Sequence, residues 1–177
     1  MEKVRLATVW LDGCSGCHMS LLDIDDRLAE MAGQIDLVYS PLVDVHDIPA
    51  PIDVLLVEGA VATTADREKL LHLRSCSRLL VALGDCALTA NVPGMRNIFD
   101  REEVLARAYA ENGRESSRPP GEDLPALLRQ VRPVHAFVKV DAFLPGCPPP
   151  ADAIFFLLSS LLEGHLPDLT GHSRFGA

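Results

Sequence analysis

Four of the five cysteines in this chain follow runs of apolar residues that are typical of buried β-strands. They are Cys14 and Cys17 after the run 4–11, Cys86 after the run 79–83, and Cys147 after the run 137–144. In a parallel α/β sheet the carboxyl ends of the strands meet at one edge, which is where such folds bind their ligands. We therefore expect these four thiols, called the rim cysteines below, to converge there. Four ligands are the number that a 4Fe-4S cluster or a structural zinc ion requires.

The fifth cysteine, Cys76, precedes its strand, near the end of a helical pattern that begins around Thr64. We expect it at the opposite edge of the sheet. An odd number of cysteines without a signal-peptide pattern argues against a disulfide framework. No apolar stretch is long enough to span a bilayer, so we expect no membrane insertion. The sequence predicts a cytoplasmic protein with reduced thiols.

The charge of the chain argues against a nucleic-acid partner. Its 16 basic and 25 acidic residues give a net charge of -9, and no long run of lysine or arginine is present. Attraction to a phosphate backbone therefore cannot be a main binding mode. The length and composition predict a single domain over residues 1–177. A stretch rich in glycine, serine and proline, at about 111–125, predicts an exposed loop.

Strand and helix patterns alternate along the chain, which predicts an α/β fold. Strands are expected at 4–11, 35–39, 54–57, 79–83 and 138–140, and helices over about 21–33, from Thr64 onward and over 153–162. Thr63 and Thr64 are good N-cap residues for the second helix. This alternation predicts a doubly wound, mostly parallel sheet with helices on both faces.

The spacing of the rim cysteines favours an iron-sulfur cluster over zinc. Structural zinc sites usually draw on two short-range cysteine pairs, whereas here one pair is joined by cysteines 69 and 130 positions beyond Cys17. Gly84 and Gly146 near the two isolated cysteines would let backbone N–H groups approach cluster sulfur. Zinc remains the alternative at this point.

Four segments resemble the small subunit of nickel-iron hydrogenases. They are 11–20 (LDGCSGCHMS), 57–60 (VEGA), 84–87 (GDCA) and 144–149 (LPGCPP). The resemblance extends from residue 4 to about 165. The complex I subunit that carries the last cluster before quinone is similar more distantly, since it typically has adjacent cysteines where this chain has Cys14-Ser-Gly-Cys17.

The resemblance is strongest to the short, single-cluster small subunit of cytoplasmic bidirectional NAD-reducing hydrogenases. Many small subunits carry further cysteines for medial and distal clusters, but none follows Cys147 here, and the segment 91–97 (NVPGMRN) is also similar. The resemblance implies one 4Fe-4S cluster on the rim cysteines. It implies electron relay between the nickel-iron centre of a large subunit and a diaphorase module with FMN and further clusters, and no catalytic centre on this chain alone.

Two alternatives stay open. One is the small subunit of a membrane-associated hydrogenase or complex I relative. The other, from another functional class, is a non-catalytic adaptor stabilised by zinc on the same four thiols. The expected fold is flavodoxin-like, and flavodoxins bind FMN at this sheet edge. However, the loop 12–17 carries cysteines in place of a phosphate-binding sequence, so nothing secures FMN on this chain.

Two further polar residues lie in the matched segments. Glu58 matches the Val-Glu-Gly of the resembled family, and we expect it to face the large subunit, as an interface hydrogen bond or a proton-path group. The alternative is an ordinary carboxylate paired to backbone N–H. His18 either donates to a cluster sulfide or is a solvated or capping residue of the first helical turn. Asp12, Asp85 and Asp141 share the rim region, and no chemistry is assigned to them.

Overall fold

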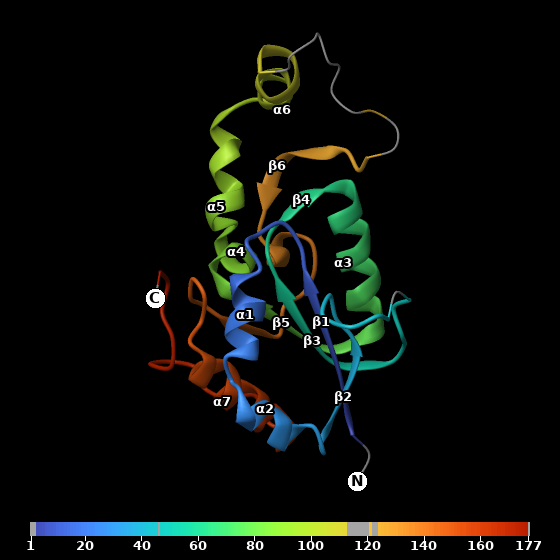
Figure 1. Ribbon diagram of the computed structural model, residues 1–177, viewed down its shortest axis with the longest axis vertical. Coiled ribbons are helices and arrows are strands. Elements are labelled where there is room, and N and C mark those ends of the chain that lie inside the picture. The colour runs from blue at the N-terminus through green and yellow to red at the C-terminus, as the bar shows by residue number, and fades with distance from the viewer. Residues whose placement is uncertain (1–2, 46, 113–120, 122–123, 177) are drawn as a thin grey trace.

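The computed structural model describes residues 3–45, 47–112, 121 and 124–176, with a five-stranded parallel sheet at its centre (Figure 1). Its strands are β1 (Val4–Trp10), β2 (Ile35–Tyr39), β3 (Ile52–Glu58), β5 (Ser77–Leu83) and β7 (Ala142–Leu144). They lie in the order β2-β1-β3-β5-β7, and each neighbouring pair is parallel. This is the strand order of flavodoxin-like sheets, which confirms the predicted doubly wound fold.

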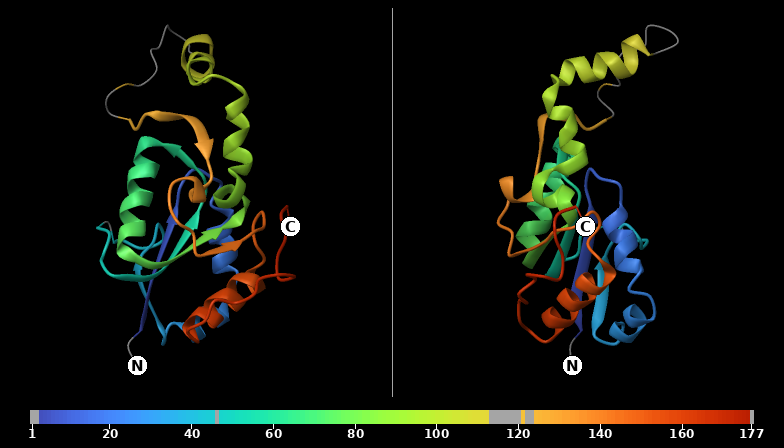
Figure 2. Two further views of the ribbon diagram at one scale, coloured as in Figure 1. Left: turned by 180° about the vertical axis from the view of Figure 1, so that it is seen from behind. Right: turned by 90° about the vertical axis from the view of Figure 1, so that its left-hand side faces the viewer.

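Helices cover both faces of the sheet, as predicted (Figure 2). The helices are α1 (Gly16–Leu22), α2 (Asp26–Met31) and α7 (Ala151–Leu162) on one face, and α3 (Thr64–Cys76) and α4 (Gly84–Thr89) on the other. Successive residues of β3 alternate between the two cores: Val54 and Leu56 pack on the first face, Leu55 and Val57 on the second. A strand buried on both sides has no polar face, which is why β3 is apolar throughout 54–57.

Helix α3 begins where the sequence predicts. The Thr63 hydroxyl accepts a hydrogen bond from the Asp66 amide at 3.1 Å, and the Asp66 carboxylate accepts one from the Thr63 amide at 2.9 Å. This capping box satisfies two backbone donors that a helix start leaves unpaired. The helix predicted over 21–33 is instead divided between α1 and α2, because Asp25 takes a left-handed φ of 60° between them.

The predicted fifth strand is present as β7, but the prediction that it includes 138–140 is wrong. A short 3-10 helix, η3 (Val134–Ala136), precedes this segment, and the sheet is joined only from Ala142 onward. Val138 and Val140 are apolar because they pack against the second core without pairing in the sheet. A buried irregular segment and a short buried strand have the same composition, so periodicity cannot separate them.

The structure adds elements that the sequence patterns did not indicate. An antiparallel pair, β4 (Val61–Thr63) and β6 (Leu127–Arg132), lies beside the main sheet. Short helices then form an arm that extends away from the sheet (Figure 1): α5 (Asn91–Gly94), η1 (Met95–Ile98), α6 (Arg101–Leu105) and η2 (Ala106–Glu111). The loop predicted at about 111–125 falls mostly on residues 113–120 and 122–123, outside the described ranges. No helix within the described ranges is long and apolar enough to cross a membrane.

Candidate metal centre at the sheet edge

The rim cysteines all lie beyond the carboxyl ends of parallel strands. Cys14 is in the loop after β1, Cys17 in the first turn of α1, Cys86 in α4 directly after β5, and Cys147 in the loop between β7 and α7. Each of the other three lies near enough to Cys17 for its charge to raise the pKa of the Cys17 thiol. Cys76 ends α3 at the opposite edge of the sheet. The structure therefore brings together the four thiols that the sequence grouped and excludes the fifth.

The four thiols differ in their exposure to solvent. Cys17 is buried and Cys86 half-buried, whereas Cys14 and Cys147 are exposed. Burial raises the pKa of the Cys17 thiol far above its ordinary value, and the nearby Glu58 carboxylate raises it further. Burial also raises the pKa of the Cys86 thiol. Without a cation these two groups hold their protons, so metal binding here must release protons.

Close backbone approach at the rim depends on two glycines. A Cβ atom at Gly84, whose φ is +81°, would lie 2.2 Å from the Cys17 sulfur. A Cβ atom at Gly146, whose φ is +136°, would lie 2.5 Å from the Cα atom of Pro149. Both backbone conformations are ones that L side chains rarely adopt. The missing side chains let the loops after β5 and β7 come together around the thiols.

Asp85 joins those same two loops. Its carboxylate accepts a hydrogen bond from the Gly146 amide at 2.7 Å, and its own amide donates to the Gly146 carbonyl at 2.8 Å. The second carboxylate oxygen accepts from the Gly176 amide at 2.7 Å. Asp85 is buried and immediately precedes Cys86. It therefore ties the loop of Cys86 to the loop of Cys147. This role cannot be predicted from the sequence, because the partner glycine lies 61 residues away.

Two N–H groups donate to rim sulfurs from the segment after α4. The backbone amide of Val92 hydrogen-bonds to Cys86 and lowers its pKa against the effect of burial. The side-chain amide of Asn91 donates to the Cys147 sulfur, with 3.6 Å between nitrogen and sulfur. Donors of this kind stabilise thiolate ligands and tune the metal that they hold. In the sequence, this segment is recognisable only through the resemblance.

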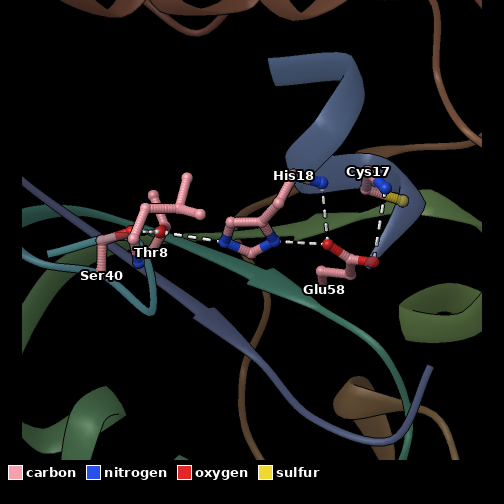
Figure 3. A network of polar contacts seen from close by, with 6 residues as sticks. Thr8, Cys17, His18, Ser40 and Glu58 are labelled. Carbon is pink, nitrogen blue, oxygen red and sulfur yellow. Dashed lines mark hydrogen bonds and ion pairs between the residues drawn. The ribbon is translucent and has the colours of Figure 1, made fainter. Parts of the chain in front are cut away.

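Glu58 is buried in the protein interior beside His18 (Figure 3). Its carboxylate accepts hydrogen bonds from the amides of Cys17 at 3.3 Å and His18 at 2.9 Å, and pairs with His18 Nδ1. His18 Nε2 lies 3.0 Å from the Thr8 hydroxyl, which donates to the Ser40 hydroxyl at 2.8 Å. The geometry matches the alternative in which Glu58 pairs with backbone N–H, and its interface role stays a prediction. His18 is neither solvated nor free to reach a sulfide, since both ring nitrogens have partners.

The donor set at the rim fits a 4Fe-4S cluster. It offers four sulfur ligands and two N–H donors to those sulfurs. Glycines stand where the backbone comes closest to the thiols. Among the described residues, no three His, Cys, Asp or Glu side chains are grouped closely enough to hold a single metal ion. A four-iron cluster needs no such grouping, because each of its four thiolates binds a different iron atom.

Residues 14–161 match the family described as NADH ubiquinone oxidoreductase, 20 kDa subunit. The chain is 39% identical to NAD-reducing hydrogenase HoxS subunit delta of Cupriavidus necator, over 94% of this chain and 82% of that protein. It is 38% identical to a subunit of the F420-non-reducing hydrogenase vhu of Methanocaldococcus jannaschii, over 94% of this chain but only 58% of that protein.

A solved structure shares the fold closely. A chain in the crystal structure of an NAD+-reducing NiFe-hydrogenase in the H2-reduced state superposes with a TM-score of 0.91 and is 40% identical. The match covers 94% of this chain and 95% of that chain. The topology described above is therefore that of a known hydrogenase chain at nearly full length.

Proposed function

The chain belongs to the family of the 20 kDa subunit of NADH ubiquinone oxidoreductase, and from this premise we propose that it is the electron-relay small subunit of an NAD-reducing nickel-iron hydrogenase. The observation that carries the proposal is the convergence of the four rim cysteines in a fold that superposes with a TM-score of 0.91 on a chain of such an enzyme. The proposed partners are a nickel-iron large subunit and diaphorase subunits with FMN and further clusters. No hydrogen turnover is expected from this chain by itself.

The rim cysteines would hold one 4Fe-4S cluster, which supplies one-electron transfer when bound. The residues of this chain fix where those thiols lie. Glu58 anchors the start of α1 through the amides of Cys17 and His18, and Asp85 ties the Cys86 loop to the Cys147 loop. The buried Cys17 defines the inner side of the site. The exposed Cys14 and Cys147 define its outer side, where a partner subunit can approach.

Identity and fold support the NAD-reducing enzymes. The chain is 39% identical to the Cupriavidus protein and 40% identical to the solved NAD+-reducing hydrogenase chain, on which it superposes with a TM-score of 0.91. The small subunit of a membrane-associated hydrogenase or complex I relative is the runner-up. The zinc-stabilised adaptor is the alternative from another functional class, and metal analysis separates it from the iron-sulfur proposal.

The first experiment is anaerobic affinity purification of the chain from its native host, followed by metal analysis and EPR. Iron and nickel together, a reduced 4Fe-4S signal and hydrogen-dependent NAD reduction would support the proposal. Zinc alone in a monomer would overturn the function. The chain offers a matched pair of variants: Cys147→Ser should lose iron, and Cys76→Ser, at the opposite edge, should retain it.

A further inference from the structure

The turn after α4 directs two donors at two different rim cysteines. Ala90 takes a left-handed φ of 65°, and its amide donates to the Cys86 carbonyl at 2.9 Å. This conformation places the next two residues over the rim, with the Val92 amide on Cys86 and the Asn91 side chain on Cys147. Each isolated cysteine thus receives one N–H donor from the same short segment.

The contacts of the Asn91 side chain do not indicate a role in stabilising the fold. Asn91 is exposed, and within the described parts of the chain its side chain makes a single hydrogen bond, to the Cys147 sulfur. An exposed polar side chain ordinarily contributes little to stability. The contact with sulfur is therefore the property of Asn91 that a substitution would change most directly.

We infer that Asn91 is a positioning residue that raises the reduction potential of the 4Fe-4S cluster by hydrogen-bonding to the Cys147 thiolate. This inference rests on the proposed function. Reduction adds one electron to the site, so sulfur becomes more negative. A donor binds more strongly to the more negative sulfur, and hydrogen bonds to cluster sulfur are among the factors that set these potentials.

The test is a potentiometric titration of the hydrogenase complex, purified anaerobically from the native host, with dithionite as the source of electrons and EPR as the readout. Asn91→Leu keeps the size of the side chain and removes the donor. It should make reduction about threefold to tenfold less favourable, a shift of about 28 to 59 mV to more negative potential at 59 mV per tenfold. The control is Asn112→Leu, which removes the same amide from an exposed position at the end of η2 and should leave the potential unchanged.

A second variant keeps the inference testable if Asn91→Leu fails to assemble. Asn91→Asp has the same size, lacks the donor and adds a negative charge, so it should shift the potential further in the same direction. Either variant with full iron content and the parent potential would overturn the inference and leave the proposed function standing. A parent complex without a 4Fe-4S signal would overturn the proposed function, and the inference with it.

Discussion

Replacing Gly84 with alanine should both destabilise the protein and disorganise the rim. The added Cβ atom would lie 2.2 Å from the Cys17 sulfur, far inside van der Waals contact, and the residue would have to keep a φ of +81°. Gly164 offers a matched control. Its φ is +88°, and nothing lies within 4 Å of where its Cβ atom would be. The pair separates the cost of the backbone conformation from the cost of the collision with sulfur.

The size of each effect follows from these geometries. A left-handed conformation costs an L residue about 1–2 kcal/mol, which is the whole penalty expected for Gly164→Ala. Gly84→Ala adds the strain of overpacking a tight interior, about 1–3 kcal/mol, for a total of about 2–5 kcal/mol. Typical domains are stable by only about 5–15 kcal/mol, so the second variant should lose a large part of its stability.

Two measurements distinguish the variants. Urea unfolding under reducing conditions should give Gly84→Ala a clearly lower free energy of unfolding than Gly164→Ala. Iron content after anaerobic purification should fall in Gly84→Ala, because the Cys17 sulfur must move, and stay at the parent level in Gly164→Ala. Equal stability and equal iron content in the two variants would refute the close approach of Gly84 to Cys17.

Four further substitutions test the charges, packing and helix capping of the fold. Burial raises the pKa of Asp141, but the Leu80 amide and two cationic side chains outweigh burial and lower that pKa overall. The ionised form of Asp141 therefore stabilises the fold above about pH 4. That contribution is lost as the pH falls through the lowered pKa. Asp141→Asn should therefore cost about 1–2 kcal/mol in urea unfolding at neutral pH and less in acid; a cost that does not change with pH would contradict this. Leu70→Ala should cost about 2–5 kcal/mol in the same assay, while Leu71→Ala, at a position that is 47% exposed, should cost under about 0.5 kcal/mol. Thr63→Ala removes the cap of α3 and should cost about 1 kcal/mol in thermal unfolding, and an unchanged midpoint would argue against the capping box.

The sheet could be predicted from sequence because burial on both faces leaves a direct record in composition. β2 agrees with its predicted bounds, and β3 and β5 contain the predicted apolar runs. The prediction failed at 138–140, where two valines pack against the core without belonging to a strand. It also missed the arm from α5 to η2, whose short helices carry exposed apolar residues and therefore lack the one-sided pattern that marks a packed helix.

At the rim, the sequence predicts where the thiols lie but not the polar contacts around them. Each rim cysteine follows a strand, and parallel strands share one carboxyl edge, so position along the chain is enough to predict convergence. The polar groups that hold the loops at the rim cannot be predicted in this way, because their partners are distant in the sequence. Asp85 and Asn91 act on loops 61 and 56 residues away, and Glu58 holds amides about 40 residues before it. The two hydrophobic cores that hold the sheet are formed by other residues, whereas these polar contacts act on the loops at the rim. Without these contacts the four thiols would still follow their strands to the rim, but the loops that carry them would lose the hydrogen bonds that tie them together.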